Sequence, residues 1–135
     1  MPKLPKVSDA EWAVMKVLWD RPGRALTAAE VIEALDPAGD RSPRTIKTLL
    51  ARLLAKSAIA AEQEGRRFVY RAKVARDALV RAESSSFLDR VFDGALAPAM
   101  VQFLNQANPT PQELAELRRI LDDAARAAKG SGGAE

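Results

Sequence analysis

Helix-start signals divide this chain into segments before any other feature is considered. Ser8, Thr27 and Thr110 are each followed three residues later by glutamate. This is the pattern of a capping box, in which the side-chain oxygen of each residue accepts a hydrogen bond from the backbone amide of the other residue. Ser42–Pro43 and Thr110–Pro111 also place proline at the first helical position, where no amide proton is needed. The signals predict four helices: about Asp9–Trp19, Ala28–Leu35, Pro43–Lys56 and Pro111–Ala128.

The first two predicted helices carry apolar side chains at helical spacing, which predicts that one face of each is buried. The residues we expect in the core are Trp12, Met15, Leu18, Trp19, Val31, Ile32 and Leu35. Pro22 and Gly23 break the chain between these helices and leave Ala25–Leu26 as a short strand.

The third helix, Pro43–Lys56, separates an apolar face from a basic one. At about 100° per residue, one set of side chains falls in a stripe roughly 140° wide that faces the core: Ile46, Leu49, Leu50, Leu53 and Leu54. The opposite side holds basic, hydroxyl and very small residues: Arg44, Lys47, Thr48, Ala51, Arg52 and Ala55. The small residues allow an external partner to approach the helix axis.

The period then changes from helical to alternating. Ala58–Gln63 and Arg66–Ala72 flank Glu64–Gly65, a two-residue turn in which glycine supplies the positive φ. This pattern predicts a β-hairpin with Arg66 and Arg67 near its tip. We interpret the two aromatic residues that share one strand face as core: Phe68 and Tyr70.

Charge is distributed unevenly along the chain. Residues 1–73 carry 14 basic and 9 acidic side chains, whereas residues 74–135 carry 7 and 9. Residues 41–73 alone hold nine basic and two acidic side chains. Such a density favours an anionic partner, although a basic helix face in isolation also suits a solvated surface. The order helix, helix, helix, hairpin is that of a winged helix-turn-helix, whose third helix enters the DNA major groove.

The sequence therefore predicts a mainly α fold with a small β-wing, in three parts. Residues 1–73 form a winged-helix DNA-binding domain, residues 74–128 a helical dimerisation region and residues 129–135 a disordered tail. The second part holds helices from Val74 to about Phe92, from Leu96 to Gln106 and from Pro111 to Ala128. Leucines of the last helix recur in steps of three and four, which suits a helix pair between two chains or within one chain.

Composition excludes several classes of protein. The chain has no cysteine and no histidine, so it lacks disulfides, thiol nucleophiles and imidazole ligands, and we expect no metal, no cofactor and no enzymatic activity. No apolar run approaches the roughly 20 residues of a membrane span, and the N-terminus does not resemble a signal peptide. We therefore expect a cytoplasmic protein without membrane insertion.

Two runs, Ser8–Trp19 and Ser42–Leu53, resemble the penicillinase-repressor (BlaI/MecI/CopY) family, as do Phe68–Tyr70 and Glu113–Arg118. The resemblance spans roughly residues 7–125. It implies a homodimeric transcriptional repressor that binds an inverted-repeat operator, with groove-facing residues Arg44, Thr45, Lys47, Thr48 and Arg52.

The predicted interfaces combine this resemblance with the patterns above. The candidate DNA-binding residues are Arg41, Ser42, Arg44, Thr45, Lys47, Thr48, Arg52, Arg66 and Arg67. The candidate dimerisation residues are Leu88, Val91, Leu96, Met100, Phe103, Leu104, Leu114, Leu117 and Leu121.

The resemblance also implies a route of induction. In β-lactam-responsive members, a membrane sensor-protease controls cleavage of the repressor at an Asn-Phe bond, which matches Gln102-Phe103 here. Glutamine in place of asparagine departs from that pattern. Two other functions remain open at this point: a winged-helix regulator with a small effector ligand, and a helical adaptor whose basic face binds an acidic protein.

Overall fold

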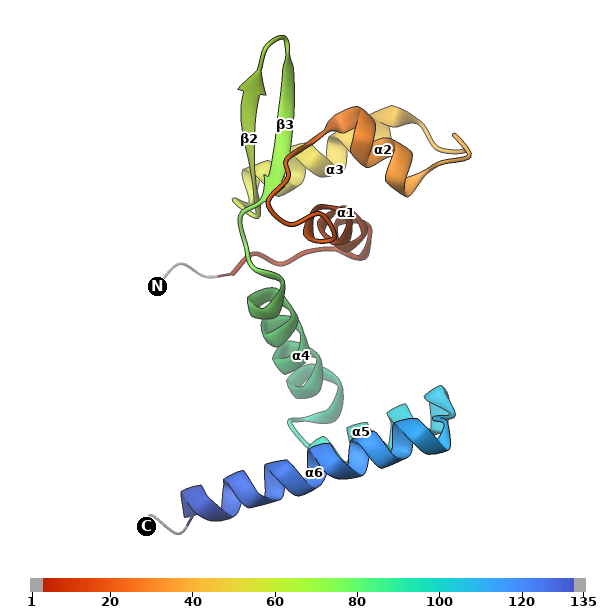
Figure 1. The fold of residues 1–135 in the computed structure, drawn as a ribbon, viewed down its shortest axis with the longest axis vertical. Helices are drawn as coiled ribbons and strands as arrows, with labels where there is room; N and C mark the ends of the chain where they lie inside the picture. Colours follow the sequence, from red (N-terminus) through yellow and green to blue (C-terminus); the bar gives the residue numbers. More distant parts are fainter. Residues whose placement is uncertain (1–3, 133–135) are drawn as a thin grey trace. The chain divides into compact units, whose positions relative to one another are not determined.

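The computed structural model describes residues 4–132, which form six helices and a three-stranded sheet (Figure 1). In chain order the elements are α1 (Asp9–Trp19), β1 (Leu26–Thr27), α2 (Ala28–Leu35), α3 (Pro43–Ala55), β2 (Ile59–Glu64), β3 (Arg67–Ala72), α4 (Arg76–Phe92), α5 (Leu96–Ala107) and α6 (Pro111–Gly132). The described residues fall into two compact units that divide between Ser84 and Ser85. The predicted fold class is confirmed: the first unit is a winged helix with the β2–β3 hairpin as its wing.

The three predicted capping boxes are present. Glu11 accepts from the backbone amide of Ser8 at 2.9 Å while Ser8 Oγ accepts from the amide of Glu11 at 3.2 Å, and this pair starts α1. Thr27 starts α2 in the same way with Glu30, at 3.0 and 3.2 Å. Thr110 and Glu113 start α6 at 3.0 and 3.1 Å. Local hydrogen bonds thus fix where these helices begin.

The core of the first unit is formed by all three of its N-terminal helices and by the sheet. Its largest fully buried apolar residues are Met15, Leu26, Ile46, Leu50, Leu53 and Leu79. Trp12 and Trp19, which we expected to be buried, lie at the edge of this core and are half-buried, with ring centroids 5.4 Å apart. Val14 and Val17, which we did not expect in the core, are buried as well, and α1 contacts α2, α3 and β3.

The sheet has the strand order β1-β3-β2, and both pairs are antiparallel. The short first strand lies one residue later than predicted. The hairpin turn is also shifted by one residue: Glu64 pairs with Arg67, so the turn is Gly65–Arg66. Gly65 has φ of +67° at the first turn position, where type II′ turns require glycine.

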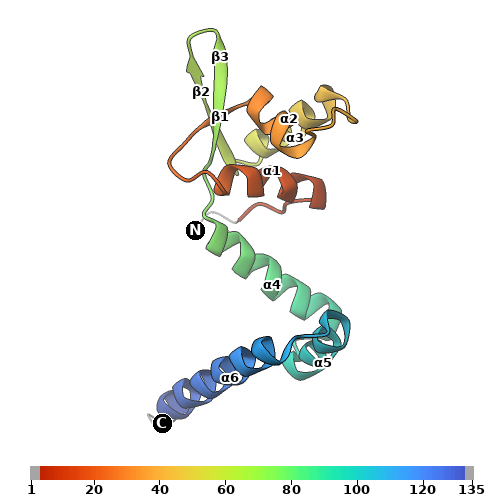
Figure 2. The same ribbon diagram turned by 45° about the vertical axis from the view of Figure 1, so that its right-hand side comes forward.

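The prediction that Phe68 is a core residue was wrong. Its side chain is 53% exposed, whereas Tyr70 on the same strand face is half-buried against the core. Phe68 pairs with Gln63 close to the turn, where the hairpin extends beyond the helices (Figure 2).

The predicted boundary after residue 73 differs from the division that the structure shows. Leu79 is fully buried in the core of the first unit, so the first turns of α4 pack with the winged helix. At the other end, residues 129–132, which were expected in the tail, continue α6, although two of these four residues are glycine. Residues 133–135 of the predicted tail lie outside the described residues. No helix among residues 4–132 is long and apolar enough to span a membrane.

An ion pair between the buried carboxylate of Glu11 and the exposed side chain of Lys56 joins the start of α1 to the end of α3. Glu11 is 1% exposed, and its Oε1 accepts from Lys56 Nζ at 2.5 Å. Lys56 Nζ also donates to the carbonyl of Lys6 at 2.8 Å. Burial raises the pKa of the Glu11 carboxyl, but the hydrogen bonds from Lys56 and Ser8 and the charge of Lys56 outweigh it and hold the pKa below the ordinary 4.5. The pair therefore favours the folded state while Glu11 is ionised.

We predict that this pair makes folding depend on pH. Because the folded pKa is lower than the unfolded one, the stabilisation is present above about pH 4.5 and is lost as the pH falls through the folded value. Urea unfolding at about pH 6 and pH 3 should show a larger loss of stability for the native chain than for Glu11→Gln, which cannot titrate. Lys56→Met should lose about 1–3 kcal/mol near neutral pH because it removes the charged donor of the buried carboxylate and leaves it the Ser8 amide alone. Equal losses in the native chain and Glu11→Gln would contradict this role.

We also predict that Ser57→Gly stabilises the first unit. Ser57 follows α3 with φ of +62°, and the amide of Ala58 closes the end of the helix by donating to the Leu53 carbonyl at 3.0 Å. Glycine removes the penalty of a Cβ at this left-handed position, so the free energy of unfolding should rise by about 0.5–1 kcal/mol. Ala51→Gly, on the exposed face of the same helix, is the control and should lose about 1 kcal/mol. A loss in both variants would show that position 57 is not strained.

Candidate nucleic-acid interface

The orientation of α3 is fixed by its cap and by its apolar face. Ser42 Oγ accepts from the amide of Arg44 at 3.2 Å, and Pro43 occupies the first turn. The buried side chains are those that the helical period predicted: Ile46, Leu49, Leu50 and Leu53, with Leu54 half-buried. The opposite face of α3 is therefore directed away from the core of the unit.

That opposite face is uncovered within the first unit. The exposed residues include every candidate DNA-binding residue on or next to α3: Arg41, Ser42, Arg44, Thr45, Lys47, Thr48 and Arg52. Ala51 and Ala55 are exposed between them. Their short side chains leave room for the edges of bases close to the helix axis, as a major-groove helix requires.

The hydroxyl of Thr48 is already used as a donor. Thr48 Oγ1 donates to the carbonyl of Arg44 at 2.9 Å, one turn earlier in α3. Its lone pairs and its methyl group remain available on the exposed face. Thr48 is thus suited to accept from a base amino group or to contact a thymine methyl.

The basic residues of α3 carry charge that no carboxylate neutralises. In residues 4–132, neither Arg44, Lys47 nor Arg52 forms an ion pair. The wing differs, because Arg67 pairs with Glu64 at 3.4 Å and Arg71 pairs with Glu62 at 3.1 Å. Among the candidate DNA-binding residues, the positive charge without an ion pair therefore lies on α3, at Arg41 before it and at Arg66, which is exposed at the wing turn.

The loop before α3 is held by a residue that sequence reasoning missed. Asp36 accepts from the amides of Asp40 at 3.0 Å and Arg41 at 2.7 Å. Gly39, with φ of +73°, allows the tight return between them. Asp36 thereby sets the direction in which Arg41 and Ser42 enter the helix. The run Asp36–Gly39 is typical of such a turn, so the sequence did contain a signal for this loop.

The wing lies in the same unit as α3 and extends beyond the helices in both views (Figures 1 and 2). Arg66, Arg67 and Phe68 are all exposed at or beside its turn. An exposed helix and a basic wing in one unit together form a surface that suits a duplex. The individual contacts to DNA stay predictions.

The candidate dimerisation residues all lie on α4, α5 and α6. Leu88, Met100 and Leu117 are half-buried, and the others are exposed: Val91, Leu96, Phe103, Leu104, Leu114 and Leu121. Gln102 and Phe103 lie within helix α5. The Phe103 ring stacks on Phe87 and meets Phe92 edge-on, with both centroid distances 6.1 Å. In residues 4–132 no group of metal-ligating side chains is present.

Comparisons with known proteins place this geometry among transcription regulators. The chain matches the family described as penicillinase repressor over residues 7–123. The penicillinase repressor of Bacillus licheniformis is 37% identical over 123 residues, which cover 91% of this chain and 94% of that protein. The methicillin resistance regulatory protein MecI of Staphylococcus aureus is 30% identical over 117 residues, 87% of this chain and 94% of its own.

A solved structure shares the fold at lower identity. The structure of MepR, a transcription regulator of the Staphylococcus aureus multidrug efflux pump MepA, is 19% identical with a TM-score of 0.53. The match covers 91% of this chain and 81% of MepR. At this identity the likeness concerns the fold alone.

We predict that the arginines of α3 dominate duplex binding. Arg44→Ala and Arg52→Ala should each weaken the affinity for a selected duplex by about 1–3 kcal/mol. A contact to guanine would relax specificity at one base pair, whereas a contact to phosphate would weaken all sequences and reduce the salt slope by about one. Fluorescence anisotropy over a salt series separates these results. Lys16→Ala, an exposed lysine on α1, is the control; an equal loss there would mean that binding follows net charge and not the α3 surface.

Proposed function

Because this chain belongs to the penicillinase repressor family, we propose that it represses transcription as a homodimer bound to an inverted-repeat operator. Its broad class is a winged-helix, DNA-binding transcriptional repressor and not an enzyme or an interaction adaptor. We further propose that it acts in the cytoplasm.

The observation that carries the proposal is the uncovered polar face of α3. Its arginines and lysine are exposed and have no ion-pair partner among the described residues, while its leucines are buried. In the proposed complex this face of each protomer lies in a major groove, and Arg66 of the wing reaches the adjacent backbone. If a dimer neutralises about eight phosphates, the logarithm of the affinity falls with the logarithm of salt at a slope of roughly −7.

Pairing is supported by how little the second unit buries by itself. Among residues 85–130, Ala99 is the one residue whose side chain is buried. Large apolar side chains remain exposed over all three helices: Phe87, Val91, Leu96, Val101, Phe103, Leu104, Leu114, Ile120 and Leu121. A helical unit of this size needs several buried large side chains to be stable. A second copy of the chain would supply the missing core, in the manner of an obligate interface.

In the proposed dimer, two linked copies of the exposed α3 face explain why pairing matters for the affinity for the operator. A dimer addresses two half-sites about one helical turn apart, roughly 34 Å. Once one α3 is bound, the second binds at a high effective concentration. Loss of pairing therefore releases the operator without any change to the DNA-contacting residues.

Proteolysis at Gln102-Phe103, the proposed relief of repression, would act through the same loss of pairing. A cut there separates α6 and the end of α5 from the rest of the chain, and with them Leu104, Leu114 and Leu121. The bond lies inside a helix whose Phe103 ring is packed against Phe87 and Phe92. Local unwinding of α5 must precede cleavage, because a protease binds its substrate as an extended strand.

We predict that Leu121→Glu produces a monomer that binds DNA weakly. Leu121 is 60% exposed on α6, so a charge there leaves the isolated helix intact and disfavours only a partner. Light scattering should show a dimer for the native chain and a monomer for the variant. Affinity for an operator duplex selected from random sequences should fall by about 100-fold.

The matched control adds the same charge at a polar position of the same helix, Gln112→Glu, and should remain a dimer with native affinity. A monomeric native chain that protects an inverted repeat in footprinting, or a monomeric Leu121→Glu that binds as tightly as the native chain, would contradict the proposed pairing. No protection of any duplex at physiological salt would contradict the repressor function itself.

A further inference from the structure

A shallow groove of about 340 Å³ lies between the wing and the start of α2, within the first unit. One side of it is formed by the end of β1 and the start of α2, and the other side by β3. The residues that line it are Thr27, Ala28, Ala29, Arg67, Phe68 and Tyr70. The α2 side has only short side chains, so the aromatic residues of β3 meet no long side chain across the groove.

The register of the sheet explains why Phe68 is exposed in this groove. β1 ends at Thr27, which pairs with Val69, because the chain enters α2 at Ala28. Phe68 is the next residue of β3, so on this side it lies beside the start of a helix and not beside a strand. The methyl group of Ala28 cannot cover a phenyl ring. The exposure of Phe68 is therefore a consequence of where β1 stops.

Phe68 is the most exposed large apolar residue in the described part of the first unit. It is 53% exposed, and the next two are Leu4 and Val80 at 41% each. A single exposed apolar side chain is common on protein surfaces, but this ring follows two arginines at the wing turn, Arg66 and Arg67. Aromatic and arginine side chains are the types that contribute most to binding at interfaces. The surroundings of Phe68 therefore favour a contact surface.

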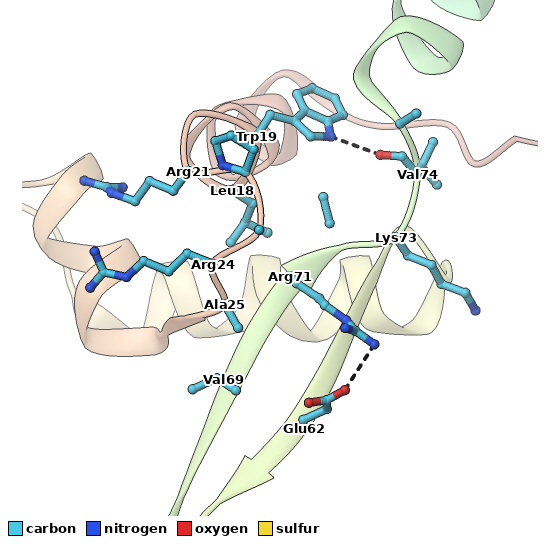
Figure 3. A pocket seen from close by; sticks show the side chains of 14 residues that line it. Leu18, Trp19, Arg21, Arg24, Ala25, Glu62, Val69, Arg71, Lys73 and Val74 are labelled. Carbon is cyan, nitrogen blue, oxygen red and sulfur yellow. Dashed lines mark hydrogen bonds and ion pairs between the residues drawn. The ribbon is translucent and has the colours of Figure 1, made fainter.

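The opposite face of β3 is used differently. Val69 and Arg71 line a separate hollow beside the end of α1, and Figure 3 shows Arg71 directed to Glu62 there, at 3.1 Å. By strand alternation, Phe68 and Tyr70 lie on the other face of the strand. The apolar contact surface of the wing is therefore on the side directed to α2, away from this ion pair.

The backbone of a duplex suits this side of the wing. The wing rises beyond α2 and α3 in both views (Figures 1 and 2), so a duplex on the exposed face of α3 passes the wing with its backbone. That backbone alternates phosphates with deoxyribose rings, whose carbon atoms are apolar. Two carboxylates of this edge are already bound by arginines: Glu64 by Arg67 at 3.4 Å and Glu30 by Arg24 at 2.7 Å. The edge therefore repels a phosphate little and offers an apolar ring to a sugar.

We propose that Phe68 is a DNA-contacting residue whose ring packs on a deoxyribose of the operator backbone, in the groove between the wing and α2. The inference rests on the proposed repressor function and deepens it, because it names a contact that is apolar and independent of base sequence. Arg66 binds through its charge, whereas Phe68 binds by burying its exposed surface. The two contacts respond differently to salt, since burial of an apolar ring displaces no counterion from the duplex.

The test measures the affinity of Phe68→Ala for the selected duplex. The affinity should fall by about tenfold for each protomer bound, as expected when half of a phenylalanine side chain is no longer covered. The slope of the logarithm of affinity against the logarithm of salt should remain that of the native chain. A duplex of unrelated sequence should lose affinity by the same factor, because a sugar contact carries no information about the bases. Fluorescence anisotropy over a salt series gives all three quantities.

Three further variants separate an apolar contact from other roles. Phe68→Leu keeps an apolar side chain and should bind within about threefold of the native chain. Val80→Ala shortens another exposed apolar residue of the first unit, outside the predicted DNA-contacting and pairing residues, and should bind like the native chain. Arg66→Ala should reduce the salt slope by about one for each protomer. An equal reduction in Phe68→Ala would mean that the ring only positions the arginines of the wing, and would overturn the proposal.

A second measurement follows the ring in the native sequence. The chain has four phenylalanines, so labelling with 4-fluorophenylalanine gives one ¹⁹F NMR signal for each. The signal that is missing in Phe68→Leu belongs to Phe68. Addition of the unrelated duplex should shift this signal in a saturable manner, and an unchanged signal would overturn the contact.

The remaining outcomes distinguish this contact from the proposed function. Native affinity in Phe68→Ala would overturn the contact alone and leave the repressor function standing. A Phe68→Ala variant that binds the duplex like the native chain but is monomeric in light scattering would assign the ring to pairing between copies. A native chain that binds no duplex at physiological salt would overturn the repressor function, and this contact with it.

Discussion

The burial of one face of α3 is the constraint on which the rest of the first unit depends. Burying a leucine or isoleucine contributes about 1.5–3 kcal/mol, so Ile46, Leu50 and Leu53, all at most 1% exposed, contribute roughly 5–9 kcal/mol. That is comparable with the whole stability of a small domain, about 5–15 kcal/mol. The helix therefore cannot rotate about its axis while the domain stays folded. The same packing that stabilises the fold fixes which side chains of α3 are exposed, so the surface proposed to contact DNA is preorganised.

The two units differ in how much of a hydrophobic core each one buries. The first buries side chains from α1, α2, α3, the sheet and the start of α4, and it is complete without a partner. In the second, the described residues 85–130 bury only Ala99, while an aromatic cluster of Phe87, Phe92 and Phe103 stays partly exposed. A change that disturbs the second unit thus leaves the first intact. In the proposed dimer, this separation would allow pairing to be lost without damage to the surface proposed to contact DNA.

Sequence reasoning succeeded where the interaction is local. The capping boxes at Ser8, Thr27 and Thr110 join residues three apart, and the stripe of α3 follows from helical periodicity. It failed where partners are distant: Glu11 and Lys56 lie 45 positions apart, and nothing in the sequence predicts that Leu79 joins the first core. The turn at Gly65–Arg66 was misplaced by one residue, because glycine suits either turn position and the register decides between them. Phe68 was also misassigned. Alternation of side chains defines the two faces of a strand, but it does not show how far along the strand the helices cover one of those faces.

Ion pairing determines how much of the basic charge can act on DNA. The nine basic residues in positions 41–73 suggest one uniform cationic surface. In the structure Lys56 is bound by Glu11, Arg67 by Glu64 and Arg71 by Glu62. The pairs in the wing are exposed and weak, and a phosphate can compete for their arginines, whereas Lys56 donates to a buried carboxylate that would be left without this donor if Lys56 turned to a phosphate. The charge that we propose acts on a duplex without rearrangement therefore belongs to α3, its N-terminal approach and Arg66 at the wing turn. A count of basic residues overstates the electrostatic part of binding, and positions on α3 matter more than the total.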